Sequence, residues 1–178
     1  MKSVLIRTVT EADAPRLLEI YSYYVEKTAI SFEYETPSLE EFRRRIRKTL
    51  ERYPYLCILA DGVITGYAYA GPFVGRAAYN RSSEMTIYLD PEARKYGFGR
   101  RLYEALEAAL KEQGILNLYA CIGYPEEDDE YLTKNSAQFH TMTRQMQFTD
   151  LDKISQIWLE SNKEAHGLLG SDGSFWIL

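Results

Sequence analysis

The first part of the chain passes from a strand-like to a helix-like hydrophobic pattern. Residues 3–9 (SVLIRTV) form a short β-rich run and predict a first strand. Apolar residues then recur every three to four positions, which predicts a helix with Thr10 or Asp13 as its N-cap. The buried face of this helix would carry Leu17, Leu18, Tyr21, Tyr24 and Val25.

Two local signals organise the next segment. Ser38 is followed three residues later by Glu41, the signature of a capping box, and a helix after it would bury Phe42, Ile46 and Leu50. Asp61-Gly62 then lies between the β-rich runs YLCILA and VITGYAYA. This dipeptide predicts a β-hairpin with a type I′ turn, because both central residues of such a turn need positive φ.

The remaining pattern completes a mixed domain. Residues 84–90 predict a fourth strand, 98–113 a helix and 116–122 a fifth strand, and an acidic loop follows. Residues 135–140 (NSAQFH) predict the start of another helix. The order β-α-α-β-β-β-α-β-α predicts an α/β (α+β) fold with a central hairpin and a later β-α-β unit.

Composition narrows the class of protein. The 178 residues suit one domain, and a hydrophobic content of 46% is enough for a real core. The net charge of −5 argues against a general nucleic-acid binder. Cys57 and Cys121 lie in apolar runs, so we expect both to be reduced and buried. Neither a signal peptide nor an 18-residue apolar run occurs, so we expect a cytoplasmic protein without a membrane partner.

The segment 94–110 (RKYGFGRRLYEALEAAL) carries the main chemical signal. Gly97 and Gly99 lack the Cβ that would keep a ligand away from the backbone N–H groups. The following helix N-terminus adds partial positive charge, and basic side chains concentrate around it, so the segment suits a pyrophosphate. A plain capped turn fits this segment equally well on its own. The lack of a GK[ST] sequence argues against nucleotide hydrolysis, and glycines after the fourth strand argue against a Rossmann site.

Several blocks in the same order extend this signal to a family. IYLDPEARKYGFGRRLYEAL resembles the acyl-CoA signature of the GNAT superfamily of N-acetyltransferases, Arg/Gln-x-x-Gly-x-Gly/Ala after a strand. The blocks beginning at IRTVTEADAP, AAYNRSSEMT and NSAQFH resemble its phosphinothricin acetyltransferase-like branch, from about residue 5 to 140. The resemblance implies a GNAT-like mixed, mostly antiparallel central sheet flanked by helices. Acyl-CoA would lie in a splay between strands 4 and 5.

The resemblance also implies catalytic residues. Glu84 matches the family's catalytic carboxylate and would act as a general base through a water molecule, with its pKa raised by partial burial. His140 would assist proton transfer or orient a carboxylate, and the alternative is a helix histidine that packs on its neighbours. Tyr131 is a candidate for protonating the leaving thiolate.

Ligand contacts follow from the same resemblance. The cosubstrate would be acetyl-CoA, no metal is expected, and the acceptor would be the primary amine of a small amino-acid-like compound. Phe32, Arg76 and Tyr79 would recognise that acceptor, although Arg76 equally fits a surface charge. The cofactor-binding residues would be Ile87, Tyr88, Leu89, Arg94, Lys95, Tyr96, Gly97, Phe98, Gly99, Arg100, Asn135 and Ser136. Relatives are often dimers, so we expect a homodimer.

The chain departs from the family pattern after His140. TMTRQMQF replaces the usual closing strands, and the segment from Thr143 predicts a strand and a capped helix that resemble the start of a second GNAT domain. An unrelated closing helix is the alternative. We therefore divide the chain into an acetyltransferase domain, 1–140, and an atypical tail, 141–178. A catalytically impaired CoA-binding or interaction protein is the alternative function, because missing strands would expose a sheet edge.

Overall fold

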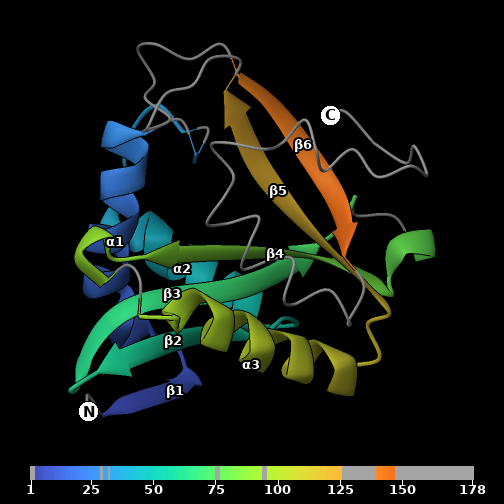
Figure 1. Cartoon of the computed structure of the whole chain (residues 1–178), viewed down its shortest axis with the longest axis horizontal. Coiled ribbons are helices and arrows are strands. Elements are labelled where there is room, and N and C mark those ends of the chain that lie inside the picture. Colours follow the sequence, from blue (N-terminus) through green and yellow to red (C-terminus); the bar gives the residue numbers. More distant parts are fainter. Residues whose placement is uncertain are drawn as a thin grey trace.

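A six-stranded sheet forms the centre of the computed structural model, which describes residues 3–28, 30–31, 33–74, 77–93, 96–125 and 139–146. The strands lie in the order β1-β2-β3-β4-β5-β6 (Figure 1). Among these described strands only β4 and β5 pair in parallel, so the predicted mixed, mostly antiparallel sheet is confirmed. Their bounds are β1 Val4–Thr8, β2 Tyr55–Ala60, β3 Val63–Pro72, β4 Ser82–Leu89, β5 Asn117–Pro125 and β6 Phe139–Met146.

The described α-helices cover the two faces of the sheet. α1 (Ala14–Lys27) and α2 (Leu39–Leu50) pack on one face, and α3 (Phe98–Glu112) packs on the other (Figure 1). Short 3-10 turns complete the described elements: η1 Glu11–Asp13, η2 Ala77–Tyr79 and η3 Pro91–Ala93. None of these described helices is long and apolar enough to cross a membrane.

Alternation along the central strands divides the core in two, because successive side chains of a strand point to opposite faces. Ala68 and Met85 join Leu102, Leu106 and Leu110 of α3 in one buried cluster. The opposite cluster joins α1 and α2 to a group of aromatic rings from the sheet. Its tyrosines are Tyr21, Tyr24, Tyr55, Tyr67 and Tyr88.

The local sequence signals match the observed turns and caps. Asp61 has φ 50° and Gly62 has φ 82°, so both positive-φ positions of the predicted hairpin turn are present. Ser38 accepts a hydrogen bond from the backbone N–H of Glu41 at 3.2 Å and caps α2. Asp13 is the N-cap of α1, and Thr10 caps the short turn before it.

Two sequence predictions are wrong. The helix expected to begin in the segment 135–140 is not found at the end of that segment, because Phe139 and His140 belong to strand β6, which pairs antiparallel with β5. That pairing satisfies the backbone groups on the outer edge of β5. Cys57 is buried as expected, but Cys121 is exposed, because Leu118 and Ala120 take the inward positions of β5.

The predicted tail overlaps the described residues only in part. The boundary between residues 140 and 141 lies inside β6, and the strand predicted from Thr143 coincides with the end of β6. The helix predicted after that strand lies outside the described residues. A partial second domain therefore stays a prediction.

An ion pair fastens β1 to the start of α1 and makes stability depend on pH. The guanidinium of Arg7 donates to both carboxylate oxygens of Asp13, each at 2.7 Å. This hydrogen bonding with Arg7, helped by Thr10, lowers the pKa of Asp13 to about 2, although burial opposes the shift. A depressed carboxyl pKa stabilises the fold above the unfolded-state pKa of about 4, and this stability is lost as the pH falls toward 2.

We expect Asp13→Asn to remove this pH-dependent stability. The free energy of unfolding should fall by on the order of 1–2 kcal/mol at pH 6, less than the full pKa shift implies because Arg7 is partly exposed. Near pH 2 the variant and the wild type should be almost equally stable. Urea unfolding at pH 2, 4 and 6 checks this, and parallel pH curves for the two proteins would contradict it.

Candidate active site

Strands β4 and β5 part after a short parallel ladder. Their register runs from Ser82 opposite Asn117 to Glu84 opposite Tyr119. Beyond this point, within the described residues, β4 pairs only with β3, and β5 pairs only with β6 (Figure 1). The facing edges of the two strands thus offer backbone N–H and C=O groups to a ligand, and the predicted splay between the fourth and fifth strands is present.

The ladder between β3 and β4 determines which groups face the splay. The N–H of Asp90 bonds to the carbonyl of Thr65 at 2.9 Å, and bonded pairs alternate along an antiparallel ladder. The backbone groups of Met85, Ile87 and Leu89 therefore point toward β5. Tyr24 already donates its hydroxyl to the Leu89 carbonyl at 2.6 Å. Ile87 is thus well placed for a ligand backbone contact, whereas the backbone of Tyr88 faces β3.

The N-terminus of α3 lies at the end of this splay. Gly97 is its N-cap and has φ 73°, a left-handed conformation that favours glycine. A Cβ on Gly99 would touch Leu89 Cδ1 at 3.4 Å and Ile87 Cδ1 at 3.6 Å, so the first turn of α3 lies close against β4. Four consecutive N–H groups at such a helix end lack partners within the helix and suit an anion.

Glu84 occupies the point where the two strands separate. Its neighbours in the sheet are Gly71 on β3 and Tyr119 on β5. A Cβ on Gly71 would meet no atom within 4 Å, so the space beside the carboxylate on that side is open. Burial raises the pKa of Glu84. No hydrogen bond or ion pair from the described residues engages its carboxylate, which leaves it able to accept a proton.

Aromatic rings gather around Tyr119, the neighbour of Glu84 on β5. Phe73 stacks on Tyr119 with ring centroids 3.7 Å apart and an angle of 5° between the planes. Tyr79 contacts Phe73 edge-on at 5.8 Å and is 40% exposed. Tyr79 is one of the residues predicted from sequence to recognise the acceptor, whereas Phe73 and Tyr119 were not predicted. Only the parallel register between β4 and β5 places Tyr119 next to Glu84, and no local sequence signal carries that register.

Some of the other predicted site residues lie near the start of α3, one lies on β6, and several lie outside the described residues. Tyr96 stacks on Phe98 at the start of α3 with centroids 5.5 Å apart, and Arg100 pairs with Glu104 at 2.9 Å. The backbone of His140 lies opposite Tyr124, five residues along β5 from Tyr119, or roughly 16 Å away. Seven predicted residues lie outside the described residues: Phe32, Arg76, Arg94, Lys95, Tyr131, Asn135 and Ser136.

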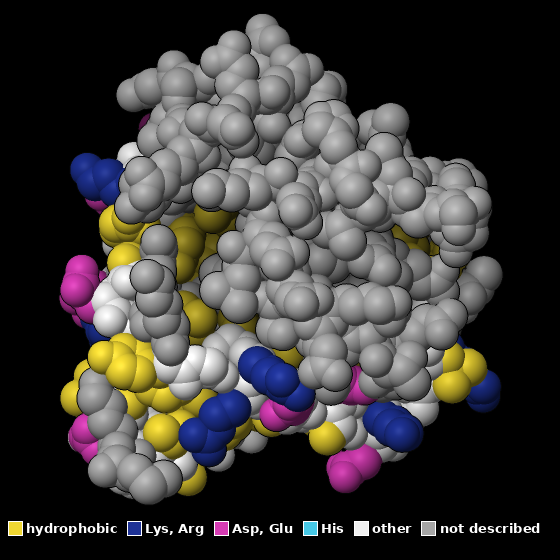
Figure 2. Space-filling view, viewed as in Figure 1, with side chains coloured by type: hydrophobic (Ala, Val, Ile, Leu, Met, Phe, Trp, Pro, Cys, Tyr) yellow, Lys and Arg dark blue, Asp and Glu magenta, His cyan; other side chains and the backbone are white. Residues whose placement is uncertain are grey.

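The charge around the site is local rather than global. Figure 2 shows basic and acidic side chains interspersed near α3, with no broad field of one sign on the described part of this face. Among the described residues, no group of three or more His, Cys, Asp or Glu could hold a metal ion. Any attraction of an anionic ligand would therefore come from the helix N-terminus and the loop before it.

Comparisons with known proteins agree on one family. Residues 6–155 match the model of the acetyltransferase (GNAT) domain. The chain is 32% identical over 126 residues to phosphinothricin N-acetyltransferase of Streptomyces viridochromogenes, covering 71% of this chain and 69% of that protein. It is 31% identical to an L-amino acid N-acyltransferase of Escherichia coli, over 61% of this chain and 64% of that one.

A solved structure gives the same result for the fold. The phosphinothricin acetyltransferase of Sinorhizobium meliloti, determined in complex with AcCoA, superimposes with a TM-score of 0.65 at 34% identity. The match covers 67% of this chain and 65% of that chain. About two thirds of this chain thus share their fold with a protein whose structure contains this molecule.

Proposed function

We propose that this chain, which belongs to the GNAT acetyltransferase family, transfers an acetyl group from acetyl-CoA to a primary amine of a small amino-acid-like acceptor. The observation that carries the proposal is the position of Glu84. It is a half-buried carboxylate with a raised pKa, without a partner among the described residues, at the point where β4 and β5 part.

The residues around the splay fit acetyl-CoA. The edge of β4 at Met85 and Ile87, which faces β5 without a described strand partner, would pair with the amide groups of the pantetheine arm, as a neighbouring strand would. The left-handed Gly97 and the N-terminus of α3 suit its pyrophosphate. Acetyl-CoA supplies the activated acetyl group. Further proposed contacts, which rest on the family resemblance alone, are Arg94, Lys95, Asn135 and Ser136.

The chain's own contribution to the chemistry is proton removal. An ammonium has no lone pair, so the acceptor must lose a proton before its nitrogen can attack the acetyl carbon. Glu84 would take that proton through a water molecule, and its raised pKa makes it a stronger base than an ordinary carboxylate. A C–N bond forms, the C–S bond breaks, and the departing thiolate gains a proton, for which Tyr131 stays the proposed donor.

The surroundings of Glu84 favour a small acceptor. Glu84 has open space beside it at Gly71, its neighbour on β3. Its neighbour on β5, Tyr119, belongs to a group of contacting aromatic rings with Phe73 and Tyr79. Two relatives are named for acetylating phosphinothricin and for acylating L-amino acids. An acceptor carboxylate would pair with Arg76 and pack near Phe32, and both contacts stay proposals.

Other features also stay proposals. The roughly 16 Å between the backbone positions of His140 and Tyr119 along β5 favours a role for His140 away from Glu84. A homodimer and a cytoplasmic location rest on the family resemblance and the sequence. The alternative function, a protein that binds CoA without turning it over, stays a prediction, although residues 141–146 pair with the outer edge of β5 as part of β6.

An amine-panel assay tests the proposal. We would incubate the protein with acetyl-CoA and phosphinothricin, methionine sulfone or single L-amino acids, and monitor release of free thiol. Turnover with one of these acceptors is expected. CoA binding without thiol release across the panel would favour the CoA-binding alternative. A folded sample that fails to bind CoA in a calorimetric titration would exclude both functions.

A further inference from the structure

We propose that Arg16, on α1, is a positioning residue for the loop that binds the pyrophosphate of CoA. Arg16 would hold Asp90 in place, and Asp90 would fix the turn from which that loop begins. The inference rests on the proposed function, because it assumes that residues 94–100 receive this part of the ligand.

Asp90 is the junction between β4 and the loop, and its polar groups are fully used. Its N–H bonds to the Thr65 carbonyl at 2.9 Å, and its own carbonyl accepts from the Ala93 N–H at 2.8 Å. One carboxylate oxygen accepts from the N–H of Glu92 at 2.9 Å, which caps η3. The other oxygen accepts from Nη2 of Arg16. The Arg16 contact is the only one of these that comes from an α-helix.

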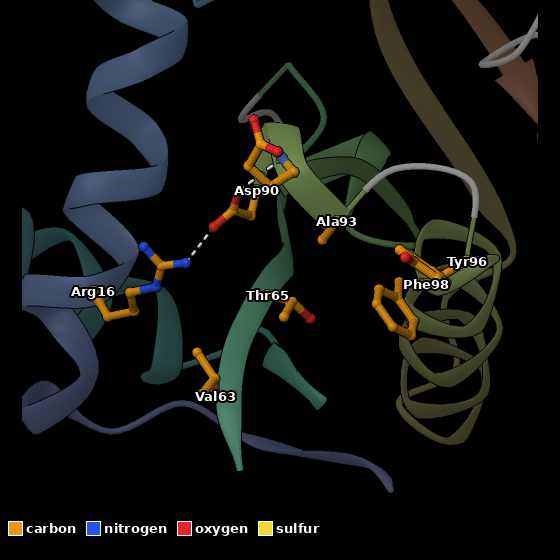
Figure 3. Close-up of a pocket in the computed structure, with 8 residues that line it drawn as sticks. Arg16, Val63, Thr65, Asp90, Ala93, Tyr96 and Phe98 are labelled. Carbon is orange, nitrogen blue, oxygen red and sulfur yellow. Dashed lines mark hydrogen bonds and ion pairs between the residues drawn. The ribbon is translucent and has the colours of Figure 1, made fainter. Parts of the chain in front are cut away.

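Arg16 is held at three points. Its Nε donates to the carbonyl of Ile64 at 3.1 Å, and its Nη1 pairs with Glu19 at 2.7 Å. Its Nη2 reaches Asp90, 74 positions further along the chain. Figure 3 shows the guanidinium extending from α1 toward Asp90, and the dashed line marks this bond. Arg16 therefore ties α1, the start of β3 and the end of β4 together.

A cavity beside η3 explains why this tie is needed. It has a volume of about 200 Å³ and lies between Arg16 and Thr65 on one side and Tyr96 and Phe98 on the other (Figure 3). Its other lining residues are Val63, Asp90, Glu92 and Ala93. Ala93 is 8% exposed and packs into the α3-side core, so apolar packing holds one side of η3. The side that faces the cavity lacks packed side chains, and there the polar contacts of Asp90 hold the turn.

The position of η3 matters for the ligand because the chain from Ala93 to Phe98 is short. This stretch leads into Gly97 and the N-terminus of α3, whose N–H groups would bind the pyrophosphate. Loss of the Arg16 contact would let η3 shift while α3 stays packed through Leu102 and Leu106. Gly97 and the first N–H groups of α3 would then be less well positioned before the ligand arrives, and affinity would fall.

Arg16→Met tests the inference, because methionine keeps an unbranched side chain but cannot donate to Asp90. We would measure CoA binding by calorimetry and pantetheine binding by ligand-observed NMR. The dissociation constant for CoA should rise about five- to twentyfold, as is typical for lost preorganisation and one charged hydrogen bond. The constant for pantetheine, which lacks the pyrophosphate, should change less than about twofold, because its contacts with β4 do not depend on the loop.

Two further variants control for general damage. Arg44→Met removes an exposed ion pair with Glu41 on α2 and should leave both constants unchanged. Arg16→Lys restores a charge near Asp90 and should recover part of the CoA affinity, and it replaces Arg16→Met if that variant does not fold. Equal losses for CoA and pantetheine, or no loss for CoA, would overturn the inference while leaving the proposed function intact. A wild-type protein that binds no CoA would overturn both.

Discussion

Replacing Glu84 with Gln is expected to lower kcat/KM for amine acetylation by about 10²–10⁴-fold, with little change in CoA affinity. Glutamine nearly matches glutamate in size, so the side chain should keep its place between the sheet neighbours Gly71 and Tyr119. What disappears is the ability to take the proton of the acceptor ammonium. Steady-state kinetics with the best amine of the panel, together with a calorimetric CoA titration, measures both quantities.

The pH profile gives a second readout of the same change. A general base works only when it is deprotonated, so wild-type kcat/KM should fall as the pH drops through the pKa of Glu84. Burial raises this pKa, so the fall should begin above the ordinary glutamate range of about 4.3. In Glu84→Gln the remaining activity should lose this acidic limb.

A second glutamate provides a matched control. Burial also raises the pKa of Glu107, which lies on α3 and is 8% exposed. Glu107→Gln should keep both the rate and the acidic limb of the wild type. If Glu107→Gln removes the limb, or if Glu84→Gln retains full activity, Glu84 is not the base.

The second large effect is expected for Gly97→Val. Gly97 has φ 73°, and a β-branched residue in this left-handed region is a genuine outlier. The strain costs about 1–2 kcal/mol, and the chain would relieve it by turning the loop N–H groups away from the ligand. The dissociation constant for CoA should therefore rise at least about tenfold, in line with that strain. Calorimetry and urea unfolding measure the changes in affinity and stability.

Gly97→Asn separates backbone strain from the loss of a glycine. Asparagine adds a side chain but tolerates the left-handed region, and a Cβ at this position would meet no atom within 4 Å. This variant should bind CoA within about threefold of the wild type, a small effect next to the strain of a β-branched residue. Equal CoA affinities for the valine and asparagine variants would show that the φ of Gly97 does not shape the binding loop.

Local chemistry explains which parts of the fold were predictable from sequence. The cap at Ser38, the bond from the Thr10 N–H to Asp13 and the turn at Asp61-Gly62 act within a few residues, so the helices and the central hairpin follow from the pattern. The prediction that Cys121 is buried was wrong because burial in a strand depends on distant partners. An apolar run such as LYACI does not reveal which alternate side chains face α3, and only the paired sheet decides this.

In the site, too, local sequence identifies some residues, whereas strand pairing decides the place of others. Glu84 and the glycines near α3 could be identified because they belong to one contiguous block. Tyr119 could not, because its place beside Glu84 depends on the register of two strands separated by α3. The bond from Arg16 to Asp90 joins residues 74 positions apart, and no periodicity in either segment indicates it.

The short parallel ladder also has a mechanical consequence. Within the described sheet, β1–β4 form one group of strands and β5–β6 another, and the described residue pairs between β4 and β5 run only from Ser82 to Glu84. Leu118 and Ala120 add side-chain contacts through the α3 cluster. A cosubstrate in the gap would add hydrogen bonds between the two groups of strands beyond the described pairs. The two groups would then open and unfold more as one unit when it is bound, so the cooperativity of the fold would vary with cosubstrate concentration.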